Sequence, residues 1–374
     1  MKNALRGLRI LDLSMNLPGP YMTWLLVEMG AEVLKIEPPK GGDLARAFMN
    51  KGQQNYFPVF DMVNRGKKSL LLDLKNPEGR ATFLALLGDY DIVIEGFRPG
   101  VMKSLKLDYD SVSPKYSNII YVSITGYGQA GSYAHRAGHD LNFQALAGSF
   151  DTGGAISQDL RVPPLPVADL AGGGLLSLSA LLAAIIERSR TGKGQQVDIS
   201  MFDGVFALNV LSLCHLQTMS ANPQTASVGH FLSGSQPFYQ IYETRDGRWM
   251  SLAAVEPKFW KNFCKAVGRE DFFELQFGGH AIIEKVSAIF KSRTQAEWVQ
   301  VFNKTDACCE PVLTLTETIG SNLCQERALL TSDDEGRPFL TSPFSSPDKQ
   351  QSEMLLTPQL GQHSEEVLSI LQGV

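Results

Sequence analysis

Short apolar strands alternate with helices through the first third of the chain, and this alternation restricts the possible folds more than any other feature. Residues 8–13 and 32–37 are predicted strands, and residues 21–29 between them carry apolar side chains at helical spacing. The pattern continues with one helix and three strands, predicted at 77–87 and at 69–74, 92–95 and 119–124. Strands that alternate with helices in this way predict an α/β fold, with a parallel sheet covered by helices on both faces.

The middle of the chain has less regular patterns. Residues 125–166 are rich in glycine and proline and predict a loop with one short helix at 141–147. An almost uniformly apolar helix is predicted at 175–188, and such a composition is typical of a buried helix. A strand at 196–199 and a helix at 202–219 are expected after it.

A change of composition near residues 220–235, which are rich in Ser, Asn, Thr and Gly, predicts a boundary between two domains. Two strand-like runs follow, 238–244 and 249–254, and the Asp246-Gly247 pair between them is a hairpin signal. Helices are then expected as far as about residue 302. The sequence after the boundary therefore predicts a smaller α+β unit.

Charge and composition exclude several classes of protein. The 374 residues carry a net charge of −5 without a basic run, so no nucleic-acid partner is expected. The longest apolar stretch, 174–186, is too short to span a bilayer, so no membrane partner is expected. Five cysteines without C-x-x-C spacing predict free thiols. Arg6 and Arg9 make the N-terminus a poor signal peptide, and we expect a cytoplasmic protein.

The turn after the first strand argues against a dinucleotide-dependent dehydrogenase. Such an enzyme needs G-x-G-x-x-G there, whereas this chain has Asn16-Leu17-Pro18-Gly19-Pro20, whose prolines remove amides that would bind phosphate. Glu37 ends the second strand, where an acid that binds ribose would lie, and we interpret it as a solvated carboxylate. The sequence has no nucleotide-binding P-loop and no G-x-S-x-G, and we predict no metal ligand.

Two glycine-flanked segments are the best candidates for chemistry. His139 and Asp140 follow Gly138, and Asp169 precedes Gly172, Gly173 and Gly174, which open the predicted apolar helix. A carboxylate at a helix N-terminus is a common cap, and His139 has the alternative role of a surface histidine. Three glycines exceed what a cap needs, and their amides are candidates for an oxyanion or phosphate site. Glu256, before Pro257, has a helix-start residue as its simplest interpretation.

Ordered matches along nearly the whole chain resemble the family III CoA-transferase superfamily, which includes α-methylacyl-CoA racemases. The matching segments are residues 5–12, 18–20, 30–38, 72–75, 95–100, 191–195, 237–239 and 358–364, together with the Gly138-His139-Asp140 segment and Asp169. The resemblance implies a large Rossmann-like α/β domain formed by residues 1–220 and 330–374. It also implies a smaller inserted α+β domain, residues 221–329, and two chains interlocked as a homodimer.

The resemblance also implies roles for the candidate residues. In the transferases the aspartate that looks like Asp169 forms an acyl anhydride and then a CoA thioester. In the racemase branch that aspartate pairs with a histidine from a Gly-His-Asp segment, which here is His139. Glu256 resembles a glutamate that supports this histidine, and Asp140 is expected to orient the site or hold the thioester. The amides of Gly172, Gly173 and Gly174 are the expected donors to an enolate oxygen.

Coenzyme A is expected as part of an acyl-CoA substrate, with no permanently bound cofactor. By resemblance its contacts are the residues Asn16, Leu17, Pro18, Leu72, Lys75, Gly96, Phe97, Arg98 and Lys103. Relatives often have an arginine where this chain has Pro38, so Lys40 or another cation is a candidate replacement.

The sequence leaves three hypotheses for function. The first is racemisation of a 2-methylacyl-CoA, or a similar 2-substituted acyl-CoA, by proton transfer between two bases through an enolate. The second is a CoA transferase that moves CoA between carboxylic acids through an anhydride at Asp169. The loop 233–236 has one glycine where such transferases have several, which favours the racemase. The third hypothesis, a catalytically silent CoA-binding protein, is disfavoured because His139, Asp169 and Glu256 are all present.

Overall fold

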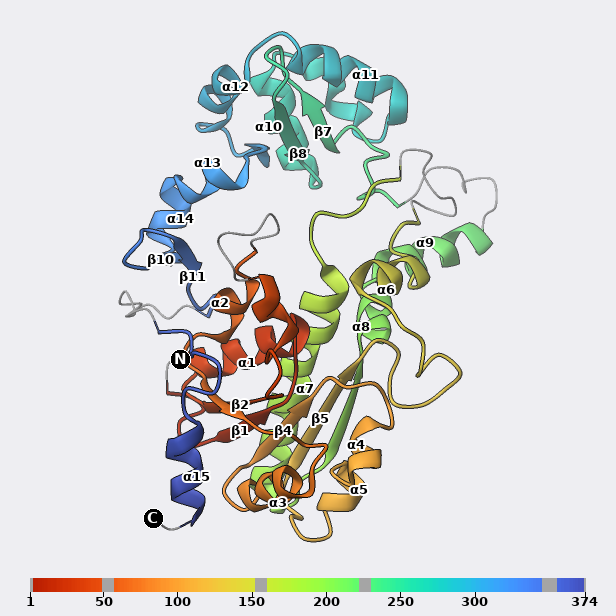
Figure 1. The fold of residues 1–374 in the computed structure, drawn as a ribbon. Helices are drawn as coiled ribbons and strands as arrows, with labels where there is room; N and C mark the ends of the chain where they lie inside the picture. Colours follow the sequence, from red (N-terminus) through yellow and green to blue (C-terminus); the bar gives the residue numbers. More distant parts are fainter. Residues whose placement is uncertain (1–2, 49–56, 152–159, 222–229, 345–354, 373–374) are drawn as a thin grey trace. The chain divides into compact units, whose positions relative to one another are not determined.

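A computed structural model describes residues 3–48, 57–151, 160–221, 230–344 and 355–372 (Figure 1). The chain divides into two compact units. The first unit comprises residues 1–149, 161–208 and 326–374, and the second comprises residues 150–160 and 209–325. The domain bounds expected from the sequence, 1–220 with 330–374 and 221–329, stay a prediction.

The first unit is built on a six-stranded parallel sheet in the order β3-β2-β1-β4-β5-β6. The strands are β1 (Arg9–Asp12), β2 (Glu32–Glu37), β3 (Lys68–Leu71), β4 (Ile92–Glu95), β5 (Ile120–Thr125) and β6 (Gln196–Ser200). Each neighbouring pair is parallel, which confirms the predicted sheet. The strand order reverses at β1, which pairs with β2 on one side and β4 on the other.

Alternate strand residues point to opposite faces, so two cores form, one on each side of the sheet. On one face, Ile10 and Ile94 pack against α1 (Pro18–Glu28) and α7 (Leu176–Thr191). On the other face, Leu11 and Val93 pack against α3 (Pro77–Leu86). The remaining helices of that second core are α4 (Val101–Leu105), α5 (Tyr109–Val112) and α15 (Ser364–Gln372). Helices on both faces therefore confirm the α/β architecture predicted from the sequence.

Several shorter elements complete the first unit. They are a 3-10 helix η1 (Leu44–Phe48), the helices α2 (Val59–Asn64), α6 (Asp140–Leu146) and α8 (Met201–Ala207), and the strands β10 (Leu330–Ser332) and β11 (Pro338–Leu340). The helix expected over 202–219 is in fact two, α8 and α9 (Val210–Ala221). The apolar pattern runs through both helices and so does not mark the break between them.

The apolar helix of the middle region begins earlier than predicted. A π-helical segment, η2 (Ala168–Leu175), precedes α7, so a continuous helix runs over Ala168–Thr191. By length and apolar composition alone this helix could cross a membrane, although core helices of globular proteins pass the same test. Leu178 and Leu181 pack in the core, whereas Leu176 and Ile186 are exposed. The prediction of a helix buried all round was therefore wrong, because only one face packs on the sheet.

The second unit contains a three-stranded antiparallel sheet, β7 (Tyr239–Glu243), β8 (Trp249–Ala253) and β9 (Cys309–Pro311). The predicted hairpin joins β7 to β8, and Gly247 takes the positive φ of 71° that its turn requires. Its helices are α9, α10 (Pro257–Ala266), η4 (Glu270–Leu275), α11 (Gly279–Phe290), α12 (Gln295–Phe302), α13 (Leu315–Ile319) and α14 (Asn322–Glu326), the last of which ends at the unit's boundary. Stacked aromatic rings, among them Trp260, Phe263 and Phe302, form its core.

Candidate active site

His139 lies at the N-terminal end of α6. It is the residue that precedes the helix, and its main-chain N–H donates to Oδ1 of Asn142 at 3.0 Å. The residue is exposed. Gly138, just before it, packs against Phe143, and a Cβ atom there would lie 2.7 Å from that ring. The backbone around His139 is thus fixed by contacts, while its imidazole stays accessible.

Asp140 connects the two candidate segments. Its Oδ1 accepts hydrogen bonds from the main-chain N–H groups of Ala168 at 2.7 Å and Asp169 at 3.1 Å. Its Oδ2 accepts from Nε2 of the buried Gln144 at 2.6 Å. Asp140 therefore caps the helix that carries Asp169, although the two segments are far apart in the sequence. Local patterns suggested that Asp169 itself was the cap, and a cap that comes from another segment leaves no such pattern.

Asp169 is the most perturbed acid of the site. Burial, and then repulsion from the neighbouring Asp140 carboxylate, raise the pKa of Asp169 from 3.8 to about 6, while His139 acts in the opposite direction. The structure therefore brings His139, Asp140 and Asp169 together, while their catalytic roles stay predictions. A carboxyl group with this pKa can both accept and return a proton near neutral pH.

Gly172, Gly173 and Gly174 lie within the π-helical segment rather than at a helix opening. In a π-helix each amide donates to the carbonyl five residues earlier, so these amides are engaged within the helix. The expected donation from them to an enolate oxygen therefore has no support in this geometry. A Cβ atom on Gly172 would lie 2.8 Å from the carbonyl oxygen of Met201, and one on Gly173 would lie 2.9 Å from Cβ of Pro18. Because these glycines have no side chains, α1 and α8 can instead pack closely against η2.

The residues expected to contact coenzyme A follow the carboxyl ends of three strands. Asn16, Leu17 and Pro18 follow β1, and Gly96, Phe97 and Arg98 follow its neighbour β4. In open α/β sheets, ligands bind at the place where the strand order reverses, which here lies between β1 and β4. Leu72 and Lys75 follow β3, and Lys103 lies on α4. Lys75 and Lys103 are exposed, whereas Leu72 is only 9% exposed and belongs to the core.

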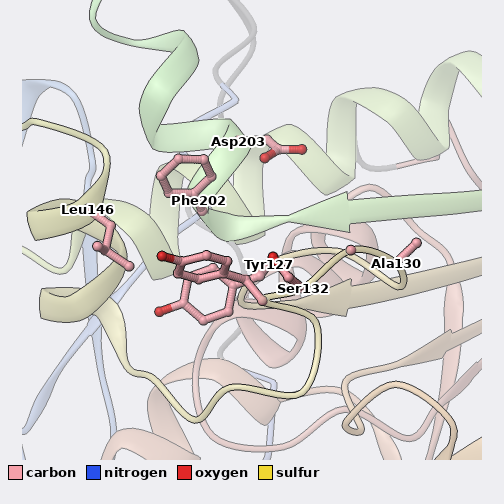
Figure 2. A pocket seen from close by; sticks show the side chains of 8 residues that line it. Tyr127, Ala130, Ser132, Leu146, Phe202 and Asp203 are labelled. Atoms are coloured by element: carbon pink, nitrogen blue, oxygen red, sulfur yellow. The ribbon is translucent and has the colours of Figure 1, made fainter.

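Two cavities of the first unit lie near these segments. A polar cavity of about 380 Å³ is lined by Arg98, Lys103, His135 and Glu95, among others, and burial raises the pKa of Glu95 to about 7. An aromatic cavity of about 420 Å³ lies between Tyr127, Tyr133, Phe202 and Leu146 (Figure 2). Tyr127 packs edge-on against Phe143 of α6, at a ring distance of 5.1 Å. Sequence reasoning missed both cavities because loop side chains shape them.

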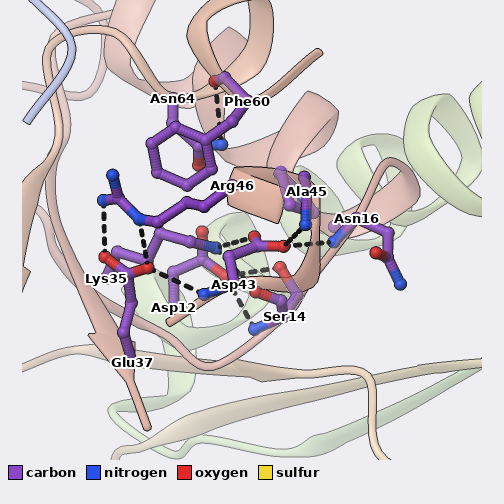
Figure 3. A network of polar contacts seen from close by, with 12 residues as sticks. Asp12, Ser14, Asn16, Lys35, Glu37, Asp43, Ala45, Arg46, Phe60 and Asn64 are labelled. Carbon is purple, nitrogen blue, oxygen red and sulfur yellow. Dashed lines mark hydrogen bonds and ion pairs between the residues drawn. The ribbon is translucent and has the colours of Figure 1, made fainter. Parts of the chain in front are cut away.

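Glu37 is not the solvated carboxylate that the sequence suggested. It is 1% exposed, and its two oxygens accept hydrogen bonds from Nε and Nη2 of Arg46 at 2.7 and 2.8 Å (Figure 3). Ser69 donates to it at 2.6 Å, and the Asp43 amide at 2.9 Å. These bonds lower the pKa of Glu37. Arg46 is thus committed to Glu37, and the replacement of the usual arginine by the exposed Lys40 or another cation stays a prediction.

Two further candidates belong to the second unit. Glu256 precedes the first turn of α10, where Pro257 follows it, and it is exposed. Residues 233–236 precede β7, and Gly234 there has a φ of 85°. The support that Glu256 would give to His139, and the shielding role of the 233–236 loop, stay predictions.

Comparisons with known proteins identify the family and agree with the fold. The family model described as CoA-transferase family III matches residues 5–364. The chain is 33% identical to an alpha-methylacyl-CoA racemase of Homo sapiens over 98% of this chain and 92% of that protein. It is 37% identical to a succinyl-CoA:mesaconate CoA-transferase of Haloarcula hispanica over 72% and 68% of the two chains. The crystal structure of Rv3272 from M. tuberculosis superposes with a TM-score of 0.81 at 28% identity, covering 97% of this chain and 98% of that one.

Proposed function

The chain belongs to CoA-transferase family III and is an enzyme of acyl-CoA chemistry, and we propose that it racemises the α-carbon of a 2-methylacyl-CoA or a similar 2-substituted acyl-CoA. One base removes the α-proton, and the electron pair of the broken C–H bond passes into the thioester carbonyl as an enolate. A second acid then returns a proton to the opposite face of the carbon. No oxidant, reductant or metal takes part in this sequence.

The observation that carries this proposal is that Asp140, next to His139, binds the start of the helix that carries Asp169, so that the two acid–base side chains come from segments held together. The pKa of about 6 at Asp169 supports it. In a racemase each of the two groups must be a base in one direction and an acid in the other. One pKa unit corresponds to about 1.4 kcal/mol, so at neutral pH both protonation states of Asp169 are within easy reach. Imidazole is the commonest partner for such transfers, which typically contribute ~10²–10⁴-fold to a rate.

The position of Asp140 supports the same assignment. Its two hydrogen bonds to the amides of Ala168 and Asp169 fix the start of the helix that carries the base. Its charge also contributes to the raised pKa of Asp169. We therefore assign Asp140 as a positioning residue rather than as a proton donor to the substrate.

A CoA transferase is the second candidate, because relatives named as CoA-transferases match at similar identity. In that reaction the Asp169 carboxylate attacks the donor thioester, and CoA leaves as the thiolate with an acyl anhydride at Asp169. The thiolate then attacks the aspartyl carbonyl, which releases the donor acid and leaves an aspartyl-CoA thioester. The acceptor acid repeats the two steps in reverse and carries the CoA away.

The decisive experiment is proton NMR in D₂O with one enantiomer of a 2-methylacyl-CoA. The racemase predicts deuterium at the α-carbon together with the opposite enantiomer, and Asp169→Asn removes both. Asp334→Asn, which changes an exposed carboxylate of the same unit, is the matched control and keeps the activity. No exchange, followed by movement of CoA to an added carboxylic acid and hydroxylamine trapping at Asp169, would contradict the racemase and favour the transferase.

The proposal includes a homodimer as the active form. Large apolar side chains of the first unit are exposed on neighbouring helices, among them Leu176, Ile186 and Phe206. Large apolar side chains that are exposed on a single chain can mark a protein interface. Light scattering during size-exclusion chromatography tests this, and a mass near the 41.0 kDa of one chain would contradict it.

A further inference from the structure

The turn after β1 is held in an unusual backbone conformation at the edge where strand order reverses. Asn16 has a φ of 64°, in the left-handed region that side chains other than asparagine and glycine rarely adopt. The residue is exposed, and Figure 3 shows its carboxamide pointing away from the polar groups behind it. A strained and exposed residue at a ligand-binding edge needs support from the surrounding structure.

Asp43 provides that support. Its Oδ1 accepts hydrogen bonds from the main-chain amides of Asn16 and Ala45, both at 2.9 Å (Figure 3). Asp43 lies in the segment after β2, so the bond to Asn16 joins the ends of two neighbouring strands. The side chain of Asp43 is completely buried. Its position is therefore set by packing and not by solvent.

Lys35 holds the charge of Asp43 in place. Its Nζ lies 2.8 Å from Oδ2 of Asp43, and both side chains are fully buried. The same Nζ donates to the carbonyl oxygen of Ser14 at 2.7 Å. Lys35 thus binds the turn at Ser14, and Asp43 binds it at Asn16, on either side of Met15.

A second buried lysine fixes the other end of the turn. Lys67 donates to the carbonyl oxygen of Pro20 at 3.1 Å and forms an ion pair with Asp12 at 3.2 Å, with both side chains fully buried. Buried ion pairs are weak contributors to stability, because desolvation offsets much of their attraction. Two such pairs beneath one short turn therefore point to a need for a defined backbone geometry.

We propose that Asp43 is a positioning residue for acyl-CoA binding, which holds the amide of Asn16 so that the exposed side of this turn binds the CoA portion of the substrate. The proposal rests on the function proposed above and extends it to a residue that never touches the ligand. Molecules in which the turn leaves this conformation bind poorly, so apparent affinity falls in proportion to the fraction that keeps it.

Two substitutions at one position separate the hydrogen bond from the charge. Asp43→Asn keeps an oxygen acceptor for the Asn16 amide, whereas Asp43→Ala removes it, and both variants remove the negative charge. The readouts are the Kd for free coenzyme A by isothermal titration calorimetry, and kcat and KM for the acyl-CoA. If either single variant fails to fold, the pair Lys35→Met/Asp43→Asn and Lys35→Met/Asp43→Ala gives the same comparison without an unpaired buried lysine.

We expect Asp43→Ala to raise Kd and KM by about tenfold or more, as for the loss of one hydrogen bond to a charged group, with kcat within about twofold of the wild type. Asp43→Asn restores both constants to within about threefold. A folded Asp43→Ala variant with wild-type Kd and KM would overturn the proposal, and so would equal losses in the two variants. A wild-type protein that does not bind coenzyme A would overturn the proposed function, and this inference with it.

Discussion

The Asp140→Asn variant is the most direct test of the electrostatic coupling between Asp140 and Asp169. The substitution keeps an oxygen that can accept from the amides of Ala168 and Asp169. It removes the negative charge, and with it the hydrogen bond that the other oxygen accepts from Gln144. The pKa of Asp169 stands about two units above its ordinary 3.8, with burial as the larger cause and Asp140 as the second. Removing the second cause should therefore lower the pKa of Asp169 by on the order of one unit, or about 1.4 kcal/mol.

The sign of this shift fixes what the assay should show. The base form of Asp169 is lost as the pH falls through its pKa, so the rate declines on the acid side. In Asp140→Asn the base form persists to lower pH, so the acid limb of the kcat/KM profile shifts to lower pH by about one pH unit. The measurement is the rate of α-proton exchange between pH 4.5 and 8 in a constant-ionic-strength buffer.

The control for this prediction is Asp140→Ala, which removes the acceptor as well as the charge. We expect it to lower kcat at every pH, because the start of η2 loses its cap and Asp169 its fixed position. An acid limb that stays in place in a folded Asp140→Asn variant, or that moves to higher pH, would refute the assigned coupling between the two carboxylates.

Three further predictions concern the same site. Asp169→Asn should raise the free energy of unfolding by up to about 3 kcal/mol above pH 6 and by nothing below pH 3.8, since the destabilisation by a raised carboxyl pKa grows as the pH rises from 3.8 to about 6 and is constant above that; equal effects at pH 8 and pH 3.5 in urea titrations would contradict this. His139→Gln should slow α-proton exchange by at least ~10²-fold in the NMR assay with unchanged binding of coenzyme A, whereas the exposed His280→Gln should have no effect; near-normal exchange would remove His139 from the mechanism. Gly172→Ala should lower the free energy of unfolding, measured by thermal unfolding, by about 1–3 kcal/mol, because its Cβ would lie 2.8 Å from a carbonyl oxygen of α8. The control Gly320→Ala, whose Cβ would have its nearest contact at 3.7 Å, should be tolerated. Equal losses in the two variants would argue against the packing role of Gly172.

The strand and helix pattern of the first unit could be predicted from the sequence because its inner strands, such as β4 and β5, are buried on both faces. Such strands appear as short apolar runs, and the predicted bounds of 32–37 and 92–95 coincide with β2 and β4. The strand order could not be predicted, because apolar runs do not specify their neighbours. The hairpin at Asp246-Gly247 was predicted from local turn chemistry alone.

The sequence offered candidate residues for the site but not their geometry. The candidates His139 and Asp169 came from their glycine-flanked segments and the family resemblance. The cap from Asp140 to the amides of η2 depends on folding two distant segments together, and no local pattern encodes it. Glu37 was misjudged for the same reason, since its partner Arg46 lies in the 3-10 helix η1, which is too short to give a periodic signal. The π-helical hydrogen bonds of η2 are likewise invisible in an apolar pattern that fits an α-helix equally well.

The wide turn of η2 has a consequence for how the position of Asp169 can change. The helix beyond Leu176 packs on the sheet through Leu178 and Leu181, and the amides at its start donate hydrogen bonds to Asp140 of α6. A π-helical turn contains more residues than an α-helical turn, so it can accommodate an additional residue between two such fixed ends without moving either of them. Each residue of an α-helix turns the chain by about 100°. Deletion of a single residue between Asp169 and Leu176 would therefore turn the carboxylate to another face of the helix, so the number of residues in this short segment determines where Asp169 points.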